Sequence, residues 1–145
     1  MKILSVDYGD ARTGLAICDS SEFLASPLYT IKEYNAEKLA EKISLAAKEN
    51  KAEEIVVGLP VNMDGSKGFR AEKCTEFGKL LEEKTGLPVT MWDERSTTVS
   101  AHNILSEMNV RGKKRKAVVD TVSAVIILES YLDYRKKHKE NQPSD

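Results

Sequence analysis

The sequence predicts a single α/β domain in which helices flank a five-stranded mixed sheet, with three antiparallel strands followed by two crossover strands. Three observations favour this class. Short β-rich runs joined by tight turns fill the first third of the 145-residue chain. From residue 36 onward, apolar residues recur at helical spacing. Two later apolar runs of strand length each follow a helical segment, as crossover connections require.

The first three strands are expected to pair as an antiparallel meander. Their connections are short and rich in Gly, Asp and Ser, which are turn-forming residues. Pro27 has no N–H to donate to a neighbouring strand, so the third strand is expected at an edge of the sheet. The three segments are Lys2–Asp7, Thr13–Cys18 and Leu24–Ile31.

Helices and strands then alternate to the end of the chain. An amphipathic helix over 36–47 precedes a buried strand at Glu54–Leu59, and a second helix, capped by Ser66, ends before Gly86 and Pro88. A fifth strand follows at Val89–Trp92. Helices over Thr97–Asn109 and Ala117–His138 complete a single domain at residues 1–138, with a frayed tail at 139–145.

Size and composition exclude several classes of protein. With 41% hydrophobic and 31% charged residues, the chain is typical of a folded globular domain. No run approaches the roughly 20 apolar residues that a membrane span needs, and Asp7 interrupts the stretch where a signal peptide would stay apolar. Cys18 and Cys74 lack CxxC spacing, which predicts reduced thiols in a cytoplasmic protein and no zinc site.

Charge is distributed unevenly along the chain. Residues 1–110 carry 13 Lys/Arg and 18 Asp/Glu, a net charge of −5, whereas residues 111–145 carry 9 and 5, a net charge of +4. Most of the positive charge lies in 111–116 and 135–139. Such patches on an acidic body favour a polyanionic partner, although they also serve to keep a protein soluble.

Three regions place carboxylates where chemistry is plausible. Asp7 closes the first strand and is followed by Gly9, which permits a tight turn or close approach to a phosphate. Asp93 and Glu94 come where the fifth strand ends, and because successive strand residues face opposite sides, only one of them can share a face with Asp7. Asp120 begins a helix that is apolar on nearly every side.

Each carboxylate also has a structural explanation. Asp7 can cap a turn, and an acid at 93 or 94 can favour the dipole of the helix that follows. Asp120 can do the same at its own helix, but it also heads a stripe of small and apolar residues that would let the helix approach the sheet. That stripe consists of Ser123, Ala124, Ile127 and Tyr131.

Three carboxylates gathered at one sheet edge would repel one another unless they held hard cations. Mg²⁺ takes oxygen ligands and commonly binds one or two carboxylates together with substrate phosphates. Two such ions about 4 Å apart can activate water and stabilise the leaving oxygen of a phosphodiester. Carboxylates and basic patches together therefore favour phosphodiester hydrolysis.

These residues resemble the YqgF family of the RNase H-like superfamily, whose members are described as Holliday junction resolvases or pre-16S rRNA nucleases. The resemblance covers roughly residues 3–135, and the segment from Gly58 to Ala71 is its most specific part. The motifs are Asp7-Tyr8-Gly9 with Arg12-x-Gly14-x-Ala16, Val57-Gly58-Leu59-Pro60 with Asn62-Met63-Asp64-Gly65-Ser66 and Arg70, Asp93-Glu94-Arg95-x-Thr97, and Lys116 with Asp120 and Ala124.

The resemblance implies an RNase H-like fold and an acidic, metal-binding and catalytic set of Asp7, Glu94 and Asp120, holding two Mg²⁺ or Mn²⁺ ions. Asp93 is then outside the set. Many relatives in the wider superfamily carry an acid at the end of the fourth strand, but Val56–Pro60 has none, so Glu94 must serve instead. The implied substrate is the immature 5′ end of small-subunit ribosomal RNA precursor, with branched DNA as the alternative.

Basic residues are expected to position the nucleic-acid backbone. Arg70, one turn into the second helix, would add a charge-assisted contact to a phosphate held at the helix N-terminus. The segment 111–116 is expected to form a basic flap over the scissile strand. Phe69, Phe77 and Trp92 are expected in the core. The full binding set is Arg12, Arg70, Arg95, Lys113, Lys114, Arg115 and Lys116.

Two other functions remain open at this stage. The pattern Asp7-x-Gly9-x-x-x-x-Gly14 resembles the phosphate-binding hairpin of actin-type phosphotransferases, but those enzymes clasp ATP between two domains and this chain has the length of one. A non-catalytic nucleic-acid-binding factor of ribosome assembly is the second alternative.

Overall fold

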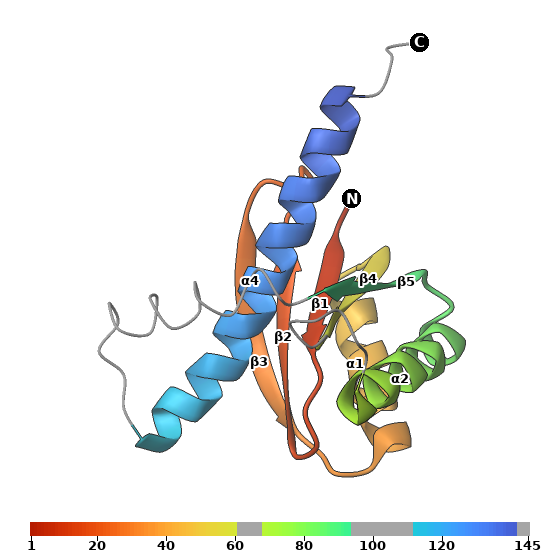
Figure 1. Cartoon of the computed structure of the whole chain (residues 1–145), viewed down its shortest axis with the longest axis vertical. Coiled ribbons are helices and arrows are strands. Elements are labelled where there is room, and N and C mark those ends of the chain that lie inside the picture. Colours follow the sequence, from red (N-terminus) through yellow and green to blue (C-terminus); the bar gives the residue numbers. More distant parts are fainter. Residues whose placement is uncertain (61–67, 94–111, 142–145) are drawn as a thin grey trace.

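The computed structural model describes residues 1–60, 68–93 and 112–141, and within the last range the side chains of 121–137 (Figure 1). The predicted helix at 97–109 lies outside the described residues. The strands are β1 (Ile3–Asp7), β2 (Arg12–Cys18), β3 (Ala25–Lys32), β4 (Glu54–Leu59) and β5 (Val89–Asp93), and the helices are α1 (Ala36–Glu49), α2 (Phe69–Thr85) and α4 (Gly112–Asn141).

The strands form one sheet in the order β3-β2-β1-β4-β5. β1, β2 and β3 pair antiparallel, whereas β4 and β5 run parallel to β1. The predicted mixed sheet is therefore confirmed. β3 is one of its two edge strands, and Pro27 lies there opposite Ala16, as the missing N–H of proline requires.

Helices cover both faces of this sheet (Figure 1). On one face, Leu4 and Val6 of β1 pack with α1 and α2 in the larger core cluster. On the other face, Ile3 packs with Ala124 and Ile127 of α4. Because alternate residues of a strand point to opposite faces, β1 and β4 are buried on both sides.

The helix ends follow local sequence signals in part. Asn35 caps α1 by accepting a hydrogen bond from the N–H of Lys38 at 3.0 Å. Gly86 ends α2 in the left-handed conformation, with φ of 69°, as the sequence predicted. The predicted N-terminal cap was wrong, since α2 begins after Gly68 with no side-chain cap, and Ser66 lies outside the described residues.

α4 is longer than predicted. It begins at Gly112 rather than Ala117, so the basic residues 113–116, which were expected to form a flap over the scissile strand, belong to the start of a helix. It also continues to Asn141, into the segment that was expected to fray. None of the described helices carries an apolar stretch of the length that a bilayer crossing requires.

Candidate functional site

The three parallel strands end at the same side of the sheet, which we call the carboxyl edge. Asp7, Leu59 and Asp93 are the last residues of β1, β4 and β5. The register pairs Val6 with Val57, and Leu59 with Asp93. In sheets with helices on both faces, ligands bind beyond the carboxyl ends of such strands. The carboxyl edge is therefore where the predicted site belongs, with no acid contributed by β4.

Alternation along β1 decides which face Asp7 occupies. Leu4 and Val6 pack toward α1 and α2. Ile3 packs toward α4, and Ser5 lies on the same side because its hydroxyl donates to a backbone carbonyl of α4. Asp7, two residues beyond Ser5, continues that series. Its carboxylate therefore belongs to the α4 face of the sheet.

α4 crosses β1 in the opposite direction to the strand. The Ser5 hydroxyl donates to the Ala124 carbonyl at 2.6 Å, and both residues are fully buried. Seven residues further along α4, the Tyr131 hydroxyl donates to Glu54 Oε1 at 3.0 Å. Glu54 pairs with Ile3 at the start of β1. Between Ala124 and Tyr131, α4 therefore passes from the middle of β1 to the start of that strand. Figure 1 shows the two elements running in opposite directions.

The same antiparallel crossing locates position 120 on the backbone. Asp120 precedes Ala124 by four residues, which is about one helical turn. The helix at this position lies on the side of Ala124 toward the carboxyl edge, where Asp7 ends β1. The described structure thus brings two of the three predicted acidic positions toward one edge and one face. The side chain of Asp120 lies outside the description.

β5 distinguishes the two neighbouring acids. Met91 packs on the α2 side of the sheet. Trp92 packs on the α4 side, where its indole N–H donates to the Ser130 hydroxyl at 3.1 Å. Alternation then assigns Asp93 to the α2 side, opposite to the face of Asp7.

The turn after Asp7 is tight. A Cβ at Gly9 would lie 2.0 Å from the backbone oxygen of Arg12, so the turn closes only with glycine at this position. The Gly9 N–H donates to Thr13 Oγ1 at 3.3 Å. Next to it, the Tyr8 ring stacks on Phe77 of α2, with ring centroids 4.3 Å apart. The end of β1 is thereby held against α2.

Arg70 is bonded to this turn. Its Nη1 donates to Asp10 Oδ1 at 2.9 Å and its Nη2 donates to the Tyr8 carbonyl at 2.6 Å. The guanidinium also lies over the Tyr8 ring, 5.5 Å from the centroid. Lys73 donates to the same Asp10 oxygen at 3.4 Å. Arg70, and after it Lys73, lower the pKa of the Asp10 carboxyl below its ordinary value.

The other predicted binding residues are distributed as follows. Arg12 is half-buried at the start of β2, opposite Lys32 of β3. Residues 113–116 lie in the first turns of α4, with side chains outside the described set. Arg95 lies outside the described residues altogether. Neither the acidic nor the basic set is therefore tested as a whole.

One aromatic expectation was wrong. Phe69 is 74% exposed at the start of α2, with the Lys73 ammonium 5.5 Å from its ring centroid. Phe77 is buried and Trp92 is packed against α4, as expected. Phe69 is exposed because it is the first residue of α2, beyond the buried stretch that begins at Ala71.

Within the described residues, no group of three His, Cys, Asp or Glu is placed to hold a metal ion. Of the predicted ligand set, only the Asp7 side chain falls in that part of the chain. Glu94 follows directly after the last described residue of β5, and Asp120 is described only as a backbone position. The predicted metal set consequently stays a prediction.

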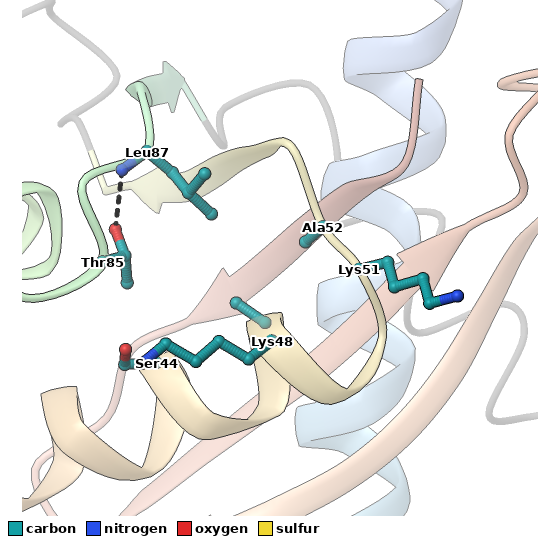
Figure 2. Close-up of a pocket in the computed structure, with 7 residues that line it drawn as sticks. Ser44, Lys48, Lys51, Ala52, Thr85 and Leu87 are labelled. Carbon is teal, nitrogen blue, oxygen red and sulfur yellow. Dashed lines mark hydrogen bonds between the residues drawn. The ribbon is translucent and has the colours of Figure 1, made fainter.

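A small pocket lies away from this edge. It has a volume of about 110 Å³ and is formed between the end of α1 and the turn after α2 (Figure 2). Ser44 and Lys48 line it from α1, Thr85 lines it from the end of α2, and Leu87 lines it from the α2–β5 connection. Because α1 leads into the start of β4, this pocket is at the opposite end of the sheet from Asp7.

Comparison with known proteins supplies independent information. The model of the family described as "RuvX: Holliday junction resolvase" matches residues 1–134. A protein of Ruminiclostridium cellulolyticum named "Putative pre-16S rRNA nuclease" is 43% identical over 134 residues, covering 92% of this chain and 94% of its own. A protein of the same name from Halothermothrix orenii is 44% identical over 137 residues, covering 94% and 98%.

Solved structures share the fold at low sequence identity. Thermus thermophilus RuvC in complex with a Holliday junction substrate superposes with a TM-score of 0.61 at 11% identity, covering 94% of this chain and 96% of that one. The fowlpox virus Holliday junction resolvase gives 0.54 at 15% identity, covering 92% and 99%. These structures confirm the RNase H-like fold. With a family match over nearly the whole chain, this protein belongs to the RuvX family of nucleases.

Proposed function

We propose that this protein is a divalent-metal-dependent nuclease that hydrolyses phosphodiester bonds at the carboxyl edge of its sheet. The observation that carries the proposal is the crossing of β1 by α4. The bond from Ser5 to the Ala124 carbonyl fixes that crossing. It supports the assignment of Asp7 and Asp120 to one site, although the two residues are 113 positions apart in sequence.

The acid from β5 is assigned to Glu94. Met91 and Trp92 show the alternation of this strand, and Asp93 shares the side of Met91. If this alternation continued by one residue, Glu94 would share the face of Asp7. The three ligands are then carboxylates only, the donor type that Mg²⁺ and Mn²⁺ prefer.

The residues divide into two tasks. Asp7, Glu94 and Asp120 would hold the metal ions, two in number. Bound Mg²⁺ or Mn²⁺ supplies an activated water nucleophile and stabilises charge on the leaving oxygen. Arg12, Arg70, Arg95 and the basic start of α4, Lys113, Lys114, Arg115 and Lys116, hold the flanking backbone phosphates.

The substrate follows from the relatives. Their names support precursor 16S ribosomal RNA as the substrate. We further propose that the cut matures its 5′ end and takes place in the cytoplasm. The family description favours a second candidate, a four-way DNA junction. Contacts to phosphates carry affinity without base identity, so the two substrates must be separated by experiment.

The test is cleavage of a precursor rRNA fragment, an unrelated single-stranded RNA and a four-way DNA junction, each with Mg²⁺ or Mn²⁺. Asp7→Asn, Glu94→Gln and Asp120→Asn are expected to lower the cleavage rate on the order of a thousandfold, because several kcal/mol of charge stabilisation are lost. Asp93→Asn is the matched control. It removes a neighbouring carboxylate from the opposite face and should retain cleavage.

Folding is checked by the melting temperature of each variant. Cleavage that survives Asp7→Asn in a folded protein contradicts the proposal. If no substrate is cut under either metal while RNA binding persists in EDTA, the protein is a binding factor of ribosome assembly instead.

A further inference from the structure

Two cations at the start of α2 share one carboxylate of the same chain. Arg70 and Lys73 both donate to Asp10 Oδ1, at 2.9 and 3.4 Å. Asp10 lies on the turn that follows β1, three residues after Asp7. Its side chain is 67% exposed and that of Arg70 is 40% exposed. The group is therefore at the carboxyl edge and open to solvent.

The Arg70 guanidinium does not depend on Asp10 for its position. Its second nitrogen donates to the Tyr8 carbonyl, and its central carbon lies over the Tyr8 ring. That ring is fixed in turn by stacking on Phe77, which is buried. Arg70 is thus held by Tyr8 on one side and presents Nη1 to Asp10 on the other.

Asp10 supplies a negative charge to Arg70 and Lys73 but contributes little to the stability of the fold. Asp10 is ionised at neutral pH, as an ordinary aspartate is, and Arg70 and Lys73 lower the pKa of its carboxyl further. Exposed ion pairs are weak, since water and salt screen them. A ligand that offers an equivalent anionic oxygen can therefore displace this carboxylate at low cost.

A phosphodiester offers such an oxygen. Like a carboxylate, it carries one negative charge over two oxygens and accepts charge-assisted hydrogen bonds from arginine and lysine. We propose that Asp10 occupies a subsite for a backbone phosphate of nucleic acid, and that binding transfers Arg70 and Lys73 from Asp10 to that phosphate. The inference rests on the proposed function in one respect only, namely that the ligand is a nucleic acid.

Two consequences distinguish this subsite from a structural ion pair. Asp10 lowers the affinity for nucleic acid, because each binding event must displace it. It leaves the number of phosphates neutralised in the complex unchanged, because Arg70 and Lys73 reach the same phosphate whether or not Asp10 is present, and that number sets the dependence of affinity on salt.

The experiment measures binding of a labelled single-stranded RNA in EDTA, where no cleavage occurs, over a series of salt concentrations. Asp10→Asn is expected to bind about fivefold more tightly at low salt, the factor that corresponds to one exposed ion pair. The slope of log K against log salt should stay the same, because the same phosphate is neutralised in both complexes.

Asp133→Asn is the matched control. Asp133 is 61% exposed and pairs with Lys137 at 3.1 Å, so this variant also removes one negative charge and releases one lysine. It does so on the part of α4 far from Asp7. An equal gain in both variants would mean a general effect of net charge and would overturn the proposal. The gain in Asp10→Asn should shrink when Lys73→Met is added.

A measurement on the unmodified protein covers the case in which Asp10→Asn is poorly folded. Saturation with RNA should raise the pKa of the Asp10 carboxyl, observed by NMR, because its two cations have moved to a phosphate. An unchanged or lower pKa contradicts the subsite. If the unmodified protein binds no nucleic acid, the proposed function fails; if it binds and Asp10→Asn gains nothing, only this inference fails.

Discussion

The ion pairs at the two ends of the parallel strands differ in how much of them is exposed to solvent. At the end where β1 and β4 begin, which we call the amino edge, Arg135 of α4 pairs with Glu22 and Glu54. All three side chains are largely buried, and Tyr131 and Thr90 add hydrogen bonds to Glu54. At the carboxyl edge, the pair of Arg70 with Asp10 is exposed.

The difference shows what each edge is suited for. Breaking a buried pair is costly, since it leaves a charge without solvent or partner. Glu54 Oε2 already lacks a hydrogen-bond partner within the described residues, and Arg135 lies 3.8 Å from it. An exposed pair is broken at little cost. The amino edge therefore holds α4 in place, while the carboxyl edge is free to exchange its partners for a ligand.

The largest effect expected from this comparison is on stability. Arg135→Met removes the guanidinium that faces the buried Glu54 and also pairs with Glu22, and should lower the free energy of unfolding by about 2–3 kcal/mol. Arg70→Met, the same change at the carboxyl edge, should cost about 1 kcal/mol or less. Urea unfolding followed by the fluorescence of Trp92, the single tryptophan, measures both. Equal losses in the two variants would remove the distinction between the edges.

A smaller effect is expected where α4 crosses the middle of β1. Ser5→Ala removes a buried hydrogen bond of 2.6 Å and should lower the free energy of unfolding by about 1 kcal/mol. Ser44→Ala is the control, because its hydroxyl also donates to a helix carbonyl, that of Lys84, but at 3.5 Å. The same urea titration should show a smaller loss for Ser44→Ala; the reverse order would argue against the Ser5 bond as the fixed point of the crossing.

The smallest effect is a pH dependence that differs between the edges. Burial raises the pKa of Tyr131, so its neutral form stabilises the fold below the ordinary tyrosine pKa of about 10, and this contribution is lost as pH rises through the raised value. Tyr131→Phe should therefore lose less stability than the unmodified protein between pH 9 and about 11. Burial also raises the pKa of Tyr29 and Cys18. Both groups are present in the unmodified protein and in Tyr131→Phe, so they do not contribute to the difference between the two.

At the carboxyl edge the sign is opposite. Arg70 lowers the pKa of Asp10, so that pair contributes above the ordinary carboxyl pKa and is lost as pH falls. The acid limb of the stability profile should respond to Asp10→Asn and the alkaline limb to Tyr131→Phe. Thermal melts across pH check this, and an alkaline limb unchanged by Tyr131→Phe contradicts the assignment.

Much of the fold could be predicted because its signals are local. Pro27 predicted an edge strand and Gly86 the end of a helix, and both are confirmed. The stripe of Ala124, Ile127 and Tyr131 predicted the face of α4 that meets the sheet, and all three are buried there. The start of α4 could not be predicted, since residues 112–116 carry charge without apolar periodicity.

The site was predictable only in part. From the sequence alone, Asp7 and Asp120 were recognisable as carboxylates whose burial without a partner would cost free energy. The sequence also determined the residue types, carboxylates and basic residues, that the proposed metal-dependent nuclease needs. It could not indicate that Arg70 would bond to Asp10, 60 residues away, or that Glu54 would be buried beneath Tyr131, 77 residues away. Those contacts depend on how α2 and α4 pack on the sheet. Periodicity and turn chemistry are properties of neighbouring residues, whereas packing brings distant charges together, and only the tertiary structure decides which of them meet and how much water they keep.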